Sequence, residues 1–244
     1  MRILRTAAIL LLPFFLGGQG RGRVAATPNL DYNGQFVFAR IRYGGLSGWG
    51  FGGSTWSHDY PRADQHLSRI LHDITTVDAT LDGSNVFELT DPDMFHFPII
   101  YVSEPGYWVM SEEDVPSLRA YLLKGGFIMF DDFEEDHLLN VEEQMKRALP
   151  ELSMIEIGIT HPIFDSFFRM KTIDFPHPMM PRLRAKYFGI FEDNDPSRRM
   201  LAMINHNSDL AEYWEWSATG MFPVDITSDA YKLGVNYVVY GMSH

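Results

Sequence analysis

The sequence predicts an α/β fold with a mostly parallel sheet. Short apolar segments rich in branched and aromatic residues alternate with segments whose apolar residues recur at helical spacing. Alternation of this kind is typical of β–α–β units, whose helices cover both faces of the sheet. No internal repeat or polar linker interrupts the pattern, so we expect a single domain over residues 27–244.

Five segments have the composition of strands. They are residues 36–41, 97–102, 127–130, 154–157 and 200–204. Right-handed crossovers between parallel strands place their carboxyl ends at the same edge of the sheet. We therefore expect the loops after Ile41, Val102, Phe130 and Ile204 to lie side by side, where open α/β sheets bind ligands.

Four segments have the pattern of helices. The first follows Pro61, and the second begins near Ser111 and stops at Gly125–Gly126. The third covers residues 138–148. The fourth covers residues 228–240, although Gly234 inside it disfavours a helix.

The first 26 residues have the layout of a secretory signal peptide. Arginines precede a short apolar run, and Val24-Ala25-Ala26 supplies the small residues of a cleavage site. We expect cleavage after Ala26 and a periplasmic or secreted protein. No later apolar segment is long enough to be a transmembrane span.

The charge and the absence of cysteine exclude several classes of function. The net charge of −12 disfavours nucleic acid and anionic lipid as partners, and loss of the arginine-bearing leader would make the chain more acidic. The chain contains no cysteine, so disulfides, thiolate metal ligands and a cysteine nucleophile are excluded. No Ser nucleophile elbow, phosphate-binding loop or zinc-protease motif occurs either.

The strongest candidate for a site is Asp131-Asp132, directly after the apolar segment 127–130. Adjacent strand residues point to opposite faces, so both can face one ligand only if the strand ends between them. One acid can then face the crevice while the other caps the next helix. The alternative is a helix-start pair that continues into the solvated acidic run after it.

Two further segments carry candidate binding residues. The glycine-rich loop from Tyr43 to Tyr60 interleaves glycines with aromatic residues, which is typical of a mobile lid or of an inert surface loop. Asn205-His206-Asn207-Ser208-Asp209 follows a strand, where His206 is a candidate base or metal ligand, or part of a simple turn. Asp132, His161, His206 and Asp209 together offer ligands for a hard or borderline cation, although no spacing requires one.

Several of these segments resemble the bacterial family called domain of unknown function 4159. The resemblance rests on Arg40-Ile41-Arg42-Tyr43-Gly44-Gly45, Gly125-Gly126-Phe127 through Asp131-Asp132, His161-Pro162-Ile163-Phe164, Asn205 through Leu210 and Gly234 through Tyr240, among others. The chain departs from the family at residues 134–137, where a glycine and an aromatic residue are usual. The resemblance implies a flavodoxin-like three-layer sandwich similar to class I glutamine amidotransferases and trehalose-utilisation-type proteins. It implies no activity, because the cysteine that those amidotransferases use is missing.

Three hypotheses about function follow. The leading one is an exported, non-catalytic binding or scaffold module of the cell envelope, with a protein partner or a small molecule as its ligand. The second is a hydrolase of a cell-envelope sugar or amide, with Asp131, Asp132 and His206 as catalytic candidates and a possible metal-bound water. The third is a structural role in which Asp131, Arg40 and Arg199 form ion pairs. The expected ligand-binding residues are Arg40, Tyr43, Gly44, Gly45, Trp56, His161, Asn205, Asn207, Asp209 and Glu215.

Overall fold

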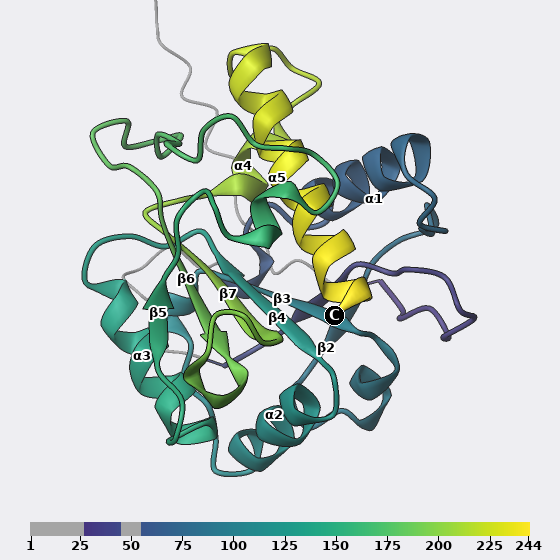
Figure 1. The fold of residues 1–244 in the computed structure, drawn as a ribbon. Coiled ribbons are helices and arrows are strands. Elements are labelled where there is room, and N and C mark those ends of the chain that lie inside the picture. The colour runs from purple at the N-terminus through teal and green to yellow at the C-terminus, as the bar shows by residue number, and fades with distance from the viewer. Residues whose placement is uncertain (1–26, 45–54) are drawn as a thin grey trace, which may run out of the picture.

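A seven-stranded, mostly parallel sheet forms the centre of the protein (Figure 1). The computed structural model describes residues 27–44 and 55–244. The expected signal peptide and most of the glycine-rich loop, including Gly45, lie outside the described residues. No helix within the described ranges combines the length and the apolar character needed to cross a membrane.

The strands are arranged in the order β2-β1-β3-β4-β7-β6-β5. The strands β2, β1, β3, β4 and β7 run parallel, whereas β6 is antiparallel to both β7 and β5. Their bounds are β1 (Ala39–Ile41), β2 (Asn85–Phe87), β3 (Ile99–Ser103), β4 (Phe127–Asp131), β5 (Met154–Glu156), β6 (Lys186–Phe191) and β7 (Met200–His206).

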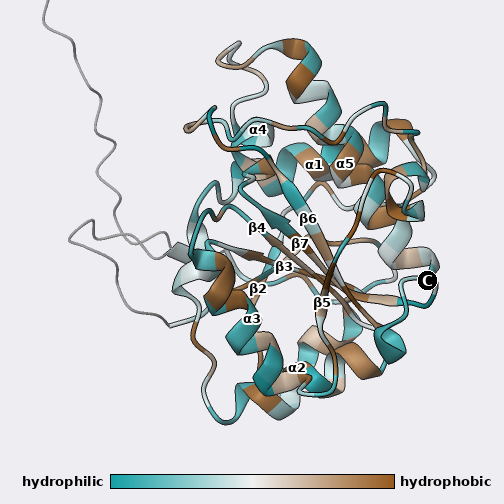
Figure 2. Ribbon diagram, turned by 60° about the vertical axis from the view of Figure 1, so that its left-hand side comes forward, coloured by the Kyte–Doolittle hydropathy of each residue, from teal (hydrophilic) through white to brown (hydrophobic). Residues whose placement is uncertain are grey.

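Helices cover both faces of this sheet (Figure 1). One face carries α1 (Arg62–Ile74), α4 (Leu210–Glu215) and α5 (Val224–Ser243), and the other carries α2 (Asp114–Leu123) and α3 (His137–Ala148). Leu67 of α1 and Leu233 of α5 pack in one apolar cluster with Met129, while Leu118 of α2 packs in the other with Ile128. The strands between the two layers are largely hydrophobic, with hydrophilic residues mostly at their ends (Figure 2), as expected for a sheet buried on both faces.

Within the described residues, the sequence predicts five of the seven strands and four of the five α-helices. It misses β2, which is only three residues long and contains the polar Asn85. It misses β6 because Gly189 interrupts an otherwise aromatic segment. A larger residue does not fit there, since a Cβ would lie 2.4 Å from the ring of Phe191. It misses α4 because six residues are too few to show helical periodicity.

The carboxyl ends of the parallel strands meet at one edge, as predicted. Ser103 at the end of β3 pairs with Asp131 at the end of β4, and Phe130 pairs with Ile204 of β7. The first residues after these strands therefore share one edge with the chain that follows β1.

Candidate functional site

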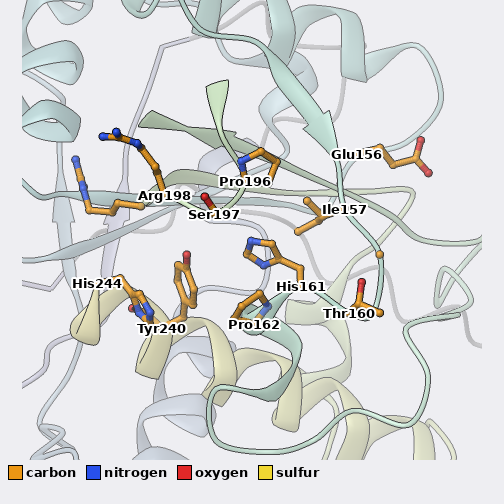
Figure 3. Close-up of a pocket in the computed structure, with 12 residues that line it drawn as sticks. Glu156, Ile157, Thr160, His161, Pro162, Pro196, Ser197, Arg198, Tyr240 and His244 are labelled. Atoms are coloured by element: carbon orange, nitrogen blue, oxygen red, sulfur yellow. The ribbon is translucent and has the colours of Figure 1, made fainter. Parts of the chain in front are cut away.

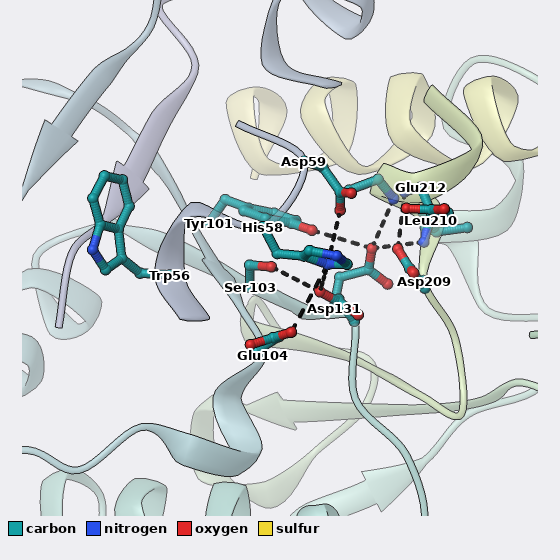
Figure 4. A network of polar contacts seen from close by, with 12 residues as sticks. Trp56, His58, Asp59, Tyr101, Ser103, Glu104, Asp131, Asp209, Leu210 and Glu212 are labelled. Atoms are coloured by element: carbon teal, nitrogen blue, oxygen red, sulfur yellow. Dashed lines mark hydrogen bonds and ion pairs between the residues drawn. The ribbon is translucent and has the colours of Figure 1, made fainter. Parts of the chain in front are cut away.

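The two adjacent acids at the end of β4 have different environments (Figure 4). The strand ends at Asp131, and Asp132 has a left-handed backbone with φ of 63°. Asp131 Oδ2 accepts hydrogen bonds from the amides of Leu210 and Ala211, at 2.7 and 3.2 Å, and from Tyr101 Oη at 3.2 Å. Asp131 therefore caps the first turn of α4 and lies completely buried beneath the edge.

Asp132 instead contacts a histidine from the loop before α1. Asp132 Oδ2 lies 2.6 Å from His58 Nδ1 and accepts a hydrogen bond from Ser103 Oγ at 3.1 Å. Burial opposes the charge on the imidazole, but the hydrogen bond and charge of Asp132 and the charge of Asp59 outweigh it and raise the pKa of His58 to about 10. At neutral pH a proton therefore lies between His58 Nδ1 and Asp132 Oδ2.

A buried arginine holds the segment that carries His58. Arg40 Nη1 donates to the carbonyls of Trp56 and His58 at 3.1 and 2.7 Å, and Arg40 Nη2 lies 2.6 Å from Asp64 Oδ1. The side chains of Arg40 and Asp64 are both fully buried. Arg40, a predicted ligand-binding residue, thus lies beneath the site and positions His58.

Asp59, Asp209 and Glu212 lie with His58 and Asp132 in one group of side chains, the carboxylate cluster. Asp59 follows His58 with a left-handed φ of 60°, and Asp209 caps α4 by accepting the amide of Glu212 at 2.9 Å. Burial raises the pKa of Asp59 to about 6, of Asp132 to about 8 and of Glu212 to about 7. Burial and the surrounding carboxylates also raise the pKa of Asp209. So many buried acids with raised pKa values are typical of functional sites.

The predicted residues Asn205 and Asn207 shape the edge of the sheet. Asn205 Nδ2 donates to the carbonyl of Phe130, and its Oδ1 accepts from Tyr237 Oη. Asn207 Oδ1 accepts the amide of Glu135 at 2.9 Å. Their side-chain bonds tie β7 and the chain after it to β4 and the turn that follows β4.

His206 faces the opposite side of the sheet from the carboxylate cluster. Its ring lies against Phe133 and Phe188, in the apolar layer beneath α2 and α3, and its Nε2 is 3.0 Å from the carbonyl oxygen of Glu135. Within the described residues, no hydrogen bond or ion pair joins His206 to Asp132. Because β7 continues through His206, strand alternation turns this side chain away from the face that Asp131 occupies. His58 has the position beside Asp132 that the sequence hypothesis gave to His206.

His161 lines a separate cavity of about 640 Å³ (Figure 3). This cavity lies between the chain after β5, the turn before β7 and the end of α5, and none of the cluster carboxylates lines it. His161 Nδ1 accepts the amide of Ile163, and its ring contacts Phe191 and Tyr240. The cation site predicted from Asp132, His161, His206 and Asp209 is therefore not assembled; only Asp132 and Asp209 lie together.

Tyr43, Gly44 and Trp56, three of the expected ligand-binding residues, lie together. They line a second cavity of about 520 Å³ next to the segment that carries His58. Tyr43 Oη donates to the carbonyls of Ser103 and Glu104, at 2.7 and 2.8 Å, so its ring is fixed beside the end of β3.

Glu215, the remaining predicted binding residue, lies at the margin of the cluster. Its Oε1 is 4.0 Å from Arg62 Nη1, and one of its carboxylate oxygens lies within 4.8 Å of ligand atoms from Asp59 and Glu212.

The ion pairs proposed for the structural hypothesis do not form. Arg40 pairs with Asp64, and Arg199 pairs with Glu192 at 2.9 Å. Asp131 takes its hydrogen bonds from backbone amides and Tyr101. The helix amides and Tyr101 satisfy Oδ2 without an arginine, whereas the buried Oδ1 of Asp131 has no hydrogen-bond partner among the described residues.

The sequence hypotheses missed His58, Asp59, Ser103 and Tyr101 as members of the site. His58-Asp59 lies near the end of the glycine-rich loop, between Trp56 and Tyr60, and the hypotheses used only the glycines and aromatic residues of this loop. The loop follows β1, whose carboxyl end is expected at the binding edge. The titratable pair His58-Asp59 in this loop could therefore have identified both residues as candidates.

Comparison with known families gives one match. The model of the family described as Domain of unknown function (DUF4159) matches residues 37–242. The matched region includes every member of the carboxylate cluster and all seven strands. No curated protein matched the chain in a sequence comparison. The chain therefore belongs to the DUF4159 family.

Proposed function

We propose that this protein is an exported binding module of the cell envelope that binds a cationic ligand at the carboxylate cluster. The observation that supports the proposal is the imbalance of charge at the site. Asp59, Asp132, Asp209 and Glu212 are all buried there, and His58 is the one basic side chain among them in the described structure. Arg40 adds no free charge, because Asp64 already neutralises it.

Burying like charges together is unfavourable unless a partner of opposite charge joins them. Protons supply that charge when no ligand is bound, which agrees with the raised pKa values of these acids. A metal ion or an amine would replace those protons.

We further infer a class I glutamine amidotransferase-like, flavodoxin-like three-layer sandwich. The mostly parallel sheet with helices on both faces supports this inference. The arginine-rich, apolar leader of the sequence supports export to the periplasm or the medium. The chain would then reach its partner or ligand outside the cytoplasm.

Calorimetric titration tests the binding proposal with spermidine as an organic cation and Mn²⁺ as a metal. We expect at least one of them to bind residues 27–244 and to bind Asp132→Asn more weakly. Asp136→Asn is the matched control, because Asp136 is an exposed acid near the site but outside the cluster. The proposal fails if neither cation binds, or if Asp132→Asn binds both as the unchanged protein does.

Hydrolysis is a second candidate function, favoured by the contact between His58 and Asp132. Asp132 holds Nδ1 of the ring, and no hydrogen bond among the described residues uses Nε2. The side chain of His58 is 23% exposed, so the ring is not sealed in the interior. A protonated imidazole in this position is suited to donate a proton to a leaving group.

Assays with cell-wall glycan and with peptide amides test this second candidate. Turnover should be lost in His58→Gln and retained in His206→Gln, because His206 faces the other side of the sheet. Equal loss in both variants would contradict the assignment of His58.

A further inference from the structure

The ligand atoms of the cluster form two overlapping groups that share Asp59 (Figure 4). The first group is His58, Asp59, Asp132 and Asp209, and the second is Asp59, Glu212 and Glu215. Within each group, one candidate ligand atom from every residue lies within 4.8 Å of the others. Two ions placed in the two groups would therefore be neighbours bridged by one carboxylate.

The environment of the Asp59 carboxylate points to a ligand. Its side chain is fully buried, and no described residue donates a geometrically defined hydrogen bond to either of its carboxylate oxygens. His58 Nδ1 lies 3.6 Å from Asp59 Oδ2, but it lies closer still to Asp132. Glu212 faces Asp59, but two carboxylates satisfy one another only through a proton or a cation. An unsatisfied buried carboxylate is costly, so Asp59 favours a cationic partner beyond the contacts that the described residues give it.

The other members of the first group keep oxygens free for a cation. Asp132 uses Oδ2 for both His58 and Ser103, and no hydrogen bond among the described residues engages its Oδ1. Asp209 uses Oδ1 for the amide of Glu212, and its Oδ2 is likewise unengaged. A cation between these groups would replace the proton that lies between His58 and Asp132.

We propose that this site holds two divalent cations of the Mn²⁺ type, bridged by Asp59. The inference rests on the proposed binding of a cationic ligand and names that ligand. The first ion takes one imidazole nitrogen and three carboxylates, and the second takes carboxylates alone. Mn²⁺ suits both donor sets, since it accepts oxygen ligands and tolerates imidazole, whereas thiolate-preferring ions find no ligand in a chain without cysteine. Paired metal sites of this kind place their ions about 3.5–4 Å apart.

Mn²⁺ binding to residues 27–244 tests the proposal by stoichiometry and by electron paramagnetic resonance. We expect two bound ions per chain and a spectrum of an exchange-coupled pair. Asp59→Asn should abolish the coupled signal, because it removes the bridge. Glu215→Gln should leave one ion with the spectrum of isolated Mn²⁺, because it touches the second group alone.

Glu142→Gln is the control, since Glu142 is an exposed acid on α3. It should bind Mn²⁺ as the unchanged protein does. The spectrum of the unchanged protein tests for the metal pair even if Asp59→Asn fails to fold. Isolated ions only, or no Mn²⁺ bound, overturns the metal pair. If spermidine still binds in that case, the proposed function stands without the metal; if neither binds, both proposals fail.

Discussion

His58 Nδ1 lies 2.6 Å from Asp132 Oδ2, although 74 positions separate the two residues in the chain. One residue ends the loop before α1 and the other begins the loop after β4. Asp132 and Asp59, the neighbour of His58, both have left-handed backbone angles that non-glycine residues rarely adopt. Strain of this kind persists only where surrounding structure fixes it, and it clusters at functional sites.

The first prediction concerns the pH dependence of stability without added metal. The pKa values of Asp59, Asp131 and Asp132 are raised by burial, to about 6, 7 and 8, from the ordinary value of 3.8. The folded protein therefore holds protons that the unfolded chain releases near pH 4. This stabilisation is fully present below pH 4 and is lost as the pH rises through 6 to 8.

The raised pKa of His58 also makes stability fall as the pH rises, over a higher pH range. Its raised pKa of about 10 stabilises the folded state fully below the ordinary value of 6.5, and the contribution is lost as the pH rises through 10. We expect the melting temperature to be higher at pH 5.5 than at pH 8.0, by about 2–4 °C for each kcal/mol lost. Asp132→Asn should flatten the profile, and a melting temperature that rises toward pH 8.0 would contradict the protonated cluster.

The second prediction separates the two adjacent acids. Asp131→Ala removes the acceptor of two backbone amides at the start of α4, so we expect a loss of about 1–3 kcal/mol in the free energy of unfolding. Asp132→Asn keeps the shape of the side chain and removes one of several like charges, but it also removes the charge that His58 contacts. Because these two effects oppose each other, the loss of stability should be smaller than in Asp131→Ala. Urea unfolding of both variants at pH 8 measures the difference. Equal destabilisation would show that Asp132 is also a structural residue.

The sequence predicts the location of the site better than its members. An apolar segment ending in Asp131-Asp132 identifies the correct edge, since parallel strands bring their carboxyl ends together. Asp209 lies in the same cluster, because it follows a strand that ends at this edge. The face on which His206 lies depends on where β7 ends. The strand continues two residues beyond the predicted end, and its alternation then places His206 on the far face.

The missed elements share a physical cause. β2 is held by contacts that are distant in sequence, including hydrogen bonds between Asn85 and Leu30, so its own three residues carry little pattern. The short helix α4 depends on Asp131 and Asp209, which satisfy the amides of its first turn. Neither the partners of a short strand nor the remote cap of a short helix can be recognised from local composition.

The third prediction concerns the buried pair of Arg40 and Asp64. Asp64→Asn leaves a fully buried guanidinium without its counter-ion, so we expect a loss of about 3–5 kcal/mol in the free energy of unfolding. The double variant Arg40→Met with Asp64→Leu should recover part of this loss. Recovery should be incomplete, because methionine cannot donate to the carbonyls of Trp56 and His58. Denaturant unfolding of the single and double variants measures both quantities, and full recovery would show that Arg40 does not fix the His58 segment.

The fourth prediction concerns Gly234, which lies inside α5 although glycine disfavours helices. A Cβ at this position would lie 2.7 Å from Trp214 Cζ2 of α4 and 2.9 Å from Leu67 Cδ1 of α1. The missing side chain therefore lets three helices approach closely on the face that carries the site. Helix propensity alone favours alanine by about 1 kcal/mol, whereas overpacking a core costs about 1–3 kcal/mol. We expect Gly234→Ala to lower the melting temperature.

Gly158→Ala is the matched control for this fourth prediction. A Cβ at Gly158 would have no heavy atom within 4 Å, so the melting temperature should not fall. Because Trp214 lies on α4 beside Glu212 and Glu215, displacement of its indole in Gly234→Ala should also move the carboxylates of that helix. Cation binding should then weaken in Gly234→Ala and remain unchanged in Gly158→Ala. An alanine at position 234 that raises the melting temperature would show that α4 and α1 adjust at little cost, and that the close approach of the three helices does not depend on glycine.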